Sequence, residues 1–350
     1  MSWHGIEGHD HVVELFRRAL RRGRLASSFL FAGPAGIGKW AFAVKLAQAM
    51  LCQQRPEERL DPCETCASCA MVLAGTHPDL DRVGKPADKS FLPLDLLIGD
   101  REHRRQEGLC HNISLKPFMG GRKIALIDDA DFLNAEGANC LLKTLEEPPP
   151  RSVLILIGTS PAKQLPTIRS RCQLVRFRPL EPAVVAQLLV ARGLVEDAAE
   201  AARLAQYSEG SVSRALELAD APLWAFRSAL YERLAAPLLD SVRLAPTVSA
   251  FVDEAGKEAP PRRARLRQVI GFAADFYRQL LKADSGVPLP DDPEIQRFVQ
   301  EALDRAPGTT AAAAVCLDRC LDALEQIDRN ANQTTLIEAW LDALAAAGQG

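Results

Sequence analysis

The chain has 350 residues, enough for two or three domains, and its 47% hydrophobic and 25% charged residues exclude disordered, collagen-like and coiled-coil chains. A formal net charge of −3 argues against a free-standing basic nucleic-acid-binding protein, so any contact with DNA has to come from local patches or from partners. The sequence has no apolar run of about 18 residues and no basic-then-apolar opening, which predicts a cytoplasmic protein without a membrane span or secretory signal.

The first half of the chain alternates between helical and strand-like patterns. Apolar residues recur at helical spacing in three stretches, residues 9–23, 40–51 and 134–147. Continuous apolar runs, typical of buried strands, occupy residues 28–32, 123–127, 153–157 and 174–177. Buried strands separated by helices predict an α/β domain whose parallel sheet is covered by helices on both faces.

After Pro179 the strand-like runs stop and only amphipathic helical patterns remain. These are residues 181–192, 197–208, 212–219, 223–236, 262–282, 292–305 and 309–347, with a proline-rich surface loop at residues 286–290. The second half is therefore predicted to be all-α.

A glycine-rich segment, Gly33-Pro34-Ala35-Gly36-Ile37-Gly38-Lys39, lies between the first predicted strand and the next helix. In this context GxxxxGK is typical of a phosphate loop: the glycines Gly33, Gly36 and Gly38 let backbone amides face the phosphates, and Lys39 contacts the terminal ones. Trp40, however, stands where a Ser or Thr hydroxyl binds Mg²⁺, and an indole has no oxygen to offer. The favoured interpretation is a vestigial loop that packs strand against helix.

Acidic and hydroxyl side chains follow two of the predicted strands. Asp128 takes the place of a Mg²⁺-associated aspartate, and Asp129 that of the glutamate that orients the attacking water, but its side chain is one methylene shorter. Because an error of about 1 Å can cost about a hundredfold in rate, we expect no ATP hydrolysis by this chain. Ser160 follows the strand at residues 153–157 and faces the third phosphate in one interpretation, or merely caps the strand in the other.

Four cysteines fall within eighteen residues: Cys52, Cys63, Cys66 and Cys69. Their spacing predicts a closed, structural Zn²⁺ site with four thiolate ligands. An iron–sulfur cluster is the chemical alternative, but the ferredoxin run requires a fourth cysteine after three intervening residues, where this chain has Leu73. The remaining cysteines are interpreted as small buried side chains: Cys110, Cys140, Cys172, Cys316 and Cys320.

Arg171 lies in the sequence Ser170-Arg171-Cys172, between a short predicted helix that begins near Pro161 and the last predicted strand. A solvated surface arginine is one interpretation. The other is an arginine finger that reaches the nucleotide of a neighbouring subunit.

Together these motifs resemble the delta-prime subunits of bacterial DNA polymerase III clamp loaders, which are members of the AAA+ superfamily. The matching segments are residues 33–39, the four-cysteine cluster, residues 75–79, 115–118, 141–149 and 170–172. The segment 141–149 and the cysteine cluster are shared with the motor subunit of the loader. What separates the two subunits is Trp40, Asp129 and the absence of a long carboxy-terminal tail.

The resemblance implies an AAA+ nucleotide-binding-like domain at residues 1–179 with a zinc insertion at 52–69, an all-α lid at 180–221 and an all-α collar at 222–350. It also implies a stator that gives Arg171 to the ATP of an adjacent gamma/tau motor subunit. The expected partners are motor and delta subunits and, through the complex, the sliding clamp and primed DNA. The chain is then part of the polymerase III nucleotidyltransferase complex without polymerase activity of its own.

The alternative from a different functional class is an ATP-hydrolysing chain. It is either the motor subunit itself or another AAA+ remodelling ATPase. Trp40 argues against both, because it removes the hydroxyl that a motor needs for Mg²⁺.

Overall fold

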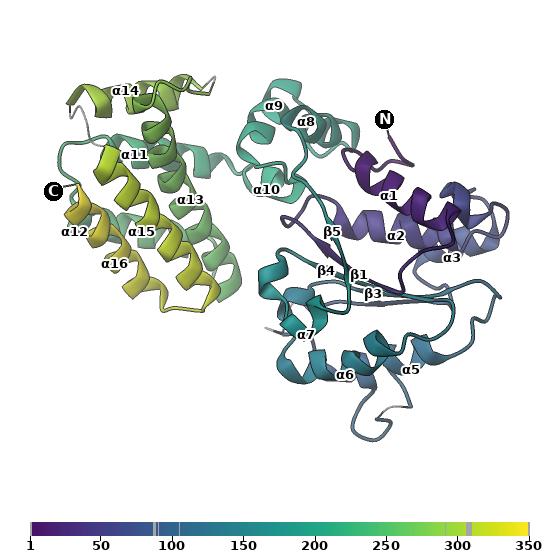
Figure 1. Ribbon diagram of the computed structural model, residues 1–350. Coiled ribbons are helices and arrows are strands. Elements are labelled where there is room, and N and C mark those ends of the chain that lie inside the picture. The colour runs from purple at the N-terminus through teal and green to yellow at the C-terminus, as the bar shows by residue number, and fades with distance from the viewer. Residues whose placement is uncertain are drawn as a thin grey trace. The chain divides into compact units, whose positions relative to one another are not determined.

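Five parallel strands form the sheet of the amino-terminal unit in the computed structural model, which describes residues 2–86, 89, 91–104, 106–290, 292–305 and 310–348. The chain divides into two compact units, Met1–Ala219 and Asp220–Gly350. The strands are β1 (Ser28–Ala32), β2 (Leu80–Val83), β3 (Lys123–Ile127), β4 (Ser152–Gly158) and β5 (Gln173–Arg176), in the order β2-β3-β4-β1-β5 (Figure 1).

The three central strands are buried on both faces, which explains their continuous apolar sequences. Along β1, Phe29 and Phe31 belong to one apolar cluster and Leu30 to the other, as the alternation of side chains across a strand requires. The sequence pattern did not predict β2, because Asp81 and Arg82 interrupt the apolar run of this edge strand.

Helices cover both faces of the sheet, as predicted (Figure 1). One face carries α1 (Asp10–Arg21), α2 (Lys39–Met50) and α3 (Ala67–Ala74); the other carries α4 (Leu94–Ile98), α5 (Leu109–Ser114), α6 (Ala135–Glu146) and α7 (Pro166–Arg169). Three short 3₁₀ helices lie in the connections: η1 (Glu57–Arg59), η2 (Ala130–Phe132) and η3 (Pro161–Lys163).

Three further helices complete this unit: α8 (Pro182–Ala191), α9 (Ala198–Tyr207) and α10 (Val212–Glu217). The first residue of α10 is tied to the glycine loop, because the amide of Val212 donates to the carbonyl of Gly36 at 3.1 Å. The structure thus groups these helices with the sheet domain, and their separation as a lid at residues 180–221 stays a prediction.

The second unit is helical throughout its described part, as predicted. Its helices are α11 (Ala221–Leu234), α12 (Ser241–Asp253), α13 (Ala259–Asp284), α14 (Pro293–Arg305), α15 (Thr310–Asp328) and α16 (Gln333–Ala347). Among the described residues, no helix combines the length and the apolar character needed to cross a membrane.

Two details of this unit were predicted wrongly. The pattern at residues 309–347 predicts one helix, but Asn330 has a left-handed backbone (φ +61°) and Asn332 caps a new helix by accepting from the Thr335 amide at 3.2 Å. Residue 309 itself lies outside the described residues. The helix α12 was missed because Pro246 in its interior is normally a helix breaker.

Candidate nucleotide site and cysteine cluster

The glycine loop joins β1 to α2 and turns sharply just before Lys39. Gly38 has φ +96°, a left-handed conformation that favours glycine, and a Cβ at Gly36 would lie only 2.3 Å from Ser211 Oγ. The ammonium of Lys39 donates to the carbonyls of Gly33 at 2.7 Å and Pro34 at 2.5 Å. The loop therefore has the predicted strand-to-helix fold and is held by contacts within the chain.

The charge of Lys39 is set by its surroundings at the base of the loop. Burial lowers the pKa of Lys39, and nearby carboxylates, of which Asp128 is the strongest, oppose that shift. The next residue, Trp40, packs against the apolar cluster beneath α1 and α2 and lines the same cavity as Lys39. Its indole offers no ligand for a hard cation.

The two acids predicted from the sequence lie at the carboxyl end of β3 and line the cavity with Lys39. The amide of Asp128 donates to the Val83 carbonyl at 2.8 Å, which continues the pairing with β2. Burial raises the pKa of Asp128. Asp129 has a left-handed backbone (φ +54°) and begins η2.

A third acid, Asp131, was not predicted and organises the end of β4. Its carboxylate accepts from the amide and the hydroxyl of Thr159, the former at 2.8 Å, and from Gln164 Nε2 at 2.7 Å. The one sequence signal is its position in the turn after β3, three residues beyond Asp128. Thr159 lines the cavity, whereas Ser160 accepts from the Ala162 amide at 3.2 Å and caps η3.

The cavity has a volume of about 650 Å³, within the usual range for a small-molecule site. Its lining includes polar side chains, Lys39 and the three acids. It also includes apolar side chains from the amino-terminal segment and from residues 180–216: Ile6, Leu180, Leu188, Leu194 and Leu216. No sequence pattern predicted these apolar lining residues, because they are scattered along the chain.

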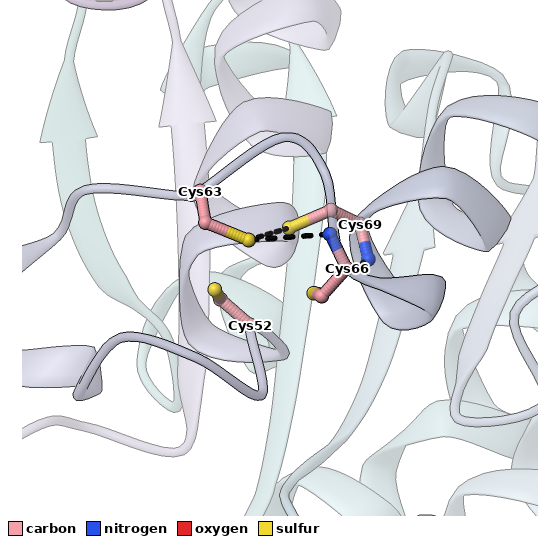
Figure 2. A group of neighbouring side chains, drawn as sticks. All are labelled: Cys52, Cys63, Cys66 and Cys69. Atoms are coloured by element: carbon pink, nitrogen blue, oxygen red, sulfur yellow. Dashed lines mark hydrogen bonds between the residues drawn. The ribbon is translucent and has the colours of Figure 1, made fainter.

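The four predicted cysteine ligands come together in space, and Figure 2 shows their sulfur atoms facing a common centre. Cys52 follows α2, Cys63 and Cys66 lie in the loop before α3, and Cys69 is in its first turn. All four sulfurs lie within 4.8 Å of one another. The Cys63 and Cys69 sulfurs are 3.9 Å apart, close to the separation of about 3.8 Å that tetrahedral bonds of about 2.3 Å to zinc require.

Backbone amides also donate hydrogen bonds to two of these sulfur atoms, which favours the thiolate form that binds a cation. The Cys66 amide donates to Cys63 Sγ at 3.3 Å, and the Cys69 amide donates to Cys66 Sγ at 3.4 Å. Burial raises the pKa of Cys63, but the hydrogen bonds from Thr65 and Cys66 outweigh it and lower the pKa to about 6. Burial raises the pKa of Cys69 instead, so the fit of these residues to a metal ion rests on the convergence of four sulfur atoms.

Arg171 follows α7 and contacts its own domain. Its Nη2 lies 2.6 Å from Glu146 Oε1 at the end of α6, while Nη1 donates to the Thr167 carbonyl at 3.0 Å and to Ser170 Oγ at 3.1 Å. The Arg171 side chain keeps 33% of its surface exposed. The guanidinium is therefore both paired within the chain and accessible from outside.

The parallel sheet, the glycine loop between β1 and α2 and the acids at the end of β3 define an α/β domain of the phosphate-loop class. The sequence model of the family described as DNA polymerase III, delta subunit, matches residues 8–181. Over these residues the chain matches the DNA polymerase III delta-subunit family, which confirms the resemblance predicted from its motifs.

Individual relatives agree with this assignment. The chain is 32% identical over 219 residues to subunit delta' of Bacillus subtilis, covering 62% of this chain and 61% of the relative. It is 37% identical over 183 residues to subunit delta' of Pseudomonas aeruginosa, covering 51% of each chain. A gamma/tau subunit of Mycobacterium tuberculosis is 32% identical over 200 residues, 56% of this chain and 32% of that protein. The matches thus span only part of each relative.

Proposed function

We propose that this chain is the non-motor subunit of a replicative clamp loader, a stator within the DNA polymerase III complex. In this role it helps to load the sliding clamp onto primed DNA, in a cytoplasmic hetero-oligomer with gamma/tau motor subunits and a delta subunit. Its sheet domain at residues 1–179 is followed by a lid at 180–221 and a collar at 222–350 that holds the subunits together. The family match and the delta' relatives support this proposal.

The observation that carries the non-motor role is the environment of Trp40. Trp40 stands at the sequence position of the Mg²⁺-binding hydroxyl, and its indole, which packs against the apolar cluster, has no oxygen to bind the metal ion. Asp129 is also too short for the water-orienting role. Both departures support a chain that does not hydrolyse ATP.

The contribution of this subunit to ATP hydrolysis is then made in trans by Arg171. An arginine suits this task because its planar fork stays charged and grips phosphate oxygens in two places. A finger supplied in trans is worth roughly 10³–10⁵ in rate in GTPases. Since a loader has several active sites, the loss of one finger lowers total turnover only in part.

The motor subunit is the second candidate function, and the similarity to gamma/tau subunits favours it. The two candidates differ in the ATP turnover of the isolated chain. We expect negligible turnover. Steady turnover that disappears in Lys39→Ala would instead identify a motor.

The test of the stator proposal is Arg171→Ala in a complex reconstituted with the motor and delta subunits from the same genome. We expect normal folding and assembly but slower DNA-stimulated ATP hydrolysis and clamp loading. Arg169→Ala is the matched control, because Arg169 is the neighbouring exposed arginine of α7. Wild-type rates in Arg171→Ala, or failure of that variant to assemble, would contradict the finger.

The cysteine cluster belongs to the same proposal as a structural zinc site. Cys52, Cys63, Cys66 and Cys69 supply four ligands and leave no open position for catalysis. Metal analysis of freshly purified protein is expected to give about one zinc per chain. Iron, or no metal, would contradict this assignment.

A further inference from the structure

The amino-terminal strap, defined here as residues 3–7, forms part of the wall of the cavity. Gly5, Ile6 and Glu7 line the cavity beside the glycine loop. The strap is a tight turn in which the backbones of Trp3 and Ile6 exchange two hydrogen bonds of 2.9 Å. His4 and Gly5 between them have left-handed backbones, with φ +49° and φ +81°. A left-handed backbone is uncommon for a non-glycine residue, although histidine adopts it more readily than most.

One of these contacts ties Trp3 to the loop between the first two cysteines. Trp3 Nε1 donates to the carbonyl of Leu60 at 2.8 Å, and both residues are buried. The indole also packs against Phe42 of α2 at 5.2 Å between ring centroids. Leu60 lies only three residues before Cys63, so its position depends on how the loop from Cys52 to Cys63 is closed.

A second contact ties His4 to acids on both sides of Cys63. His4 Nε2 lies 2.7 Å from Asp61 Oδ1, and its Nδ1 lies 3.2 Å from Glu64 Oε1. Glu64 in turn accepts from Lys45 Nζ of α2 at 2.8 Å. The strap is therefore joined to the segment around Cys63 at three residues: Leu60, Asp61 and Glu64.

We propose that a metal ion at the four cysteines holds the strap in place and thereby sets the shape of the nucleotide-site cavity. Metal ligation closes the loop between Cys52 and Cys63 and fixes the turn from Cys63 to Cys66, because the cysteines can bind one ion together only when these segments are folded. Without the metal, these segments lose their common anchor. The Leu60 carbonyl and the two acids then no longer hold Trp3 and His4. This inference rests on the metal site in the proposed function.

The test is hydrogen exchange of the full chain, followed by mass spectrometry, before and after the metal is removed by a chelator. Metal loss is expected to speed exchange in peptides covering residues 2–8 by about fivefold or more, which is the loss of about one hydrogen bond's stabilisation. Peptides from α13 in the second unit are the internal reference. Unchanged exchange of residues 2–8 after verified metal loss would overturn the proposal.

A substitution separates the strap from general unfolding of the cysteine loop. Trp3→Phe keeps an aromatic ring but removes the N–H that Leu60 accepts, so the metal-loaded variant is expected to exchange faster at residues 2–8 while retaining its metal. Trp340→Phe is the matched control, since it removes an indole donor to Cys320 Sγ in the second unit. If residues 2–8 of Trp3→Phe exchange at the wild-type rate, the hydrogen bond from Trp3 to Leu60 does not hold the strap, and the proposal is overturned. If the purified protein neither holds nor takes up zinc, the metal proposal and its control of the strap both fail. The Trp3→Phe comparison then still shows whether the hydrogen bond from Trp3 to Leu60 holds the strap.

Discussion

Replacing Glu146 by glutamine removes the carboxylate that Arg171 contacts in the isolated chain. If Arg171 is a finger, this carboxylate competes with the phosphate of the neighbouring subunit, because two anions cannot share one guanidinium at close range without repelling each other. We therefore expect Glu146→Gln to raise the DNA-stimulated ATP turnover of the assembled complex. Arg171→Ala acts in the opposite direction.

The size of the effect follows from the exposure of the pair. The two side chains are 33% and 49% exposed, although the closest atoms are 2.6 Å apart. Pairs this accessible to water contribute roughly 0.2–1 kcal/mol, which corresponds to about a 1.4-fold to fivefold change in the ratio of free to paired finger. The increase is expected to be largest at low salt and to shrink as ions screen the pair.

The assay is steady-state ATP turnover of the reconstituted complex with clamp and primed DNA, at low and at high salt. Glu147→Gln is the matched control, because it removes the same charge one residue further along, where the structure gives Arg171 no contact. If Glu146→Gln slows turnover as Arg171→Ala does, Glu146 positions the finger and does not compete for it. If Arg171→Ala slows turnover and Glu146→Gln leaves it unchanged at every salt concentration, the pair has no part in the reaction.

Two further predictions concern stability. Asp292→Asn removes the carboxylate 2.5 Å from the buried Arg227 guanidinium and is expected to lower the free energy of unfolding by about 2 kcal/mol in urea titrations. Glu294→Gln is expected to lower it less, because the Glu294 carboxylate is 3.2 Å from the guanidinium and more exposed, and equal losses would contradict this ranking. Burial lowers the pKa of His9, so between about pH 6.5 and the lower folded pKa the unfolded chain binds more protons than the folded chain. The free energy of unfolding therefore falls as the pH falls through this range, and His9→Gln is expected to make that fall shallower by less than about 1.4 kcal/mol per pH unit; an unchanged pH dependence would contradict this.

An element could be predicted from the sequence where a single physical requirement determined its residues. Strands buried on both faces must be apolar at every position, and for that reason β1, β3 and β4 were predicted within a residue or so of their observed bounds. The edge strand β2 pairs on one side only, its residues after Leu80 are partly buried, and it carries Asp81 and Arg82. Its strand character depends on pairing with β3, which no local pattern reveals.

The same distinction separates the parts of the site that were predicted from those that were not. The cysteine cluster was predictable because a tetrahedral metal site fixes both residue type and close spacing. Asp131 was not, because its partners Thr159 and Gln164 lie just after β4 and just after η3. The position of Asp131 in the turn after β3 does not reveal these partners until those elements have folded. The strap contacts of Trp3 and His4 are of the same long-range kind.

Contacts within the chain are sufficient to explain the fold of the glycine loop, and none of them involves a phosphate. Lys39 is bound to the loop carbonyls, Gly36 accepts from the first amide of α10, and Trp40 is packed into the apolar cluster. Each anchor lies within the chain, so the loop keeps its conformation without a bound nucleotide. A motor needs Mg²⁺ ligands in addition to this fold, and Trp40 serves packing where a hydroxyl would serve the metal. Retention of the loop is therefore compatible with the proposed non-motor role, and Lys39 by itself is no argument for an active ATPase.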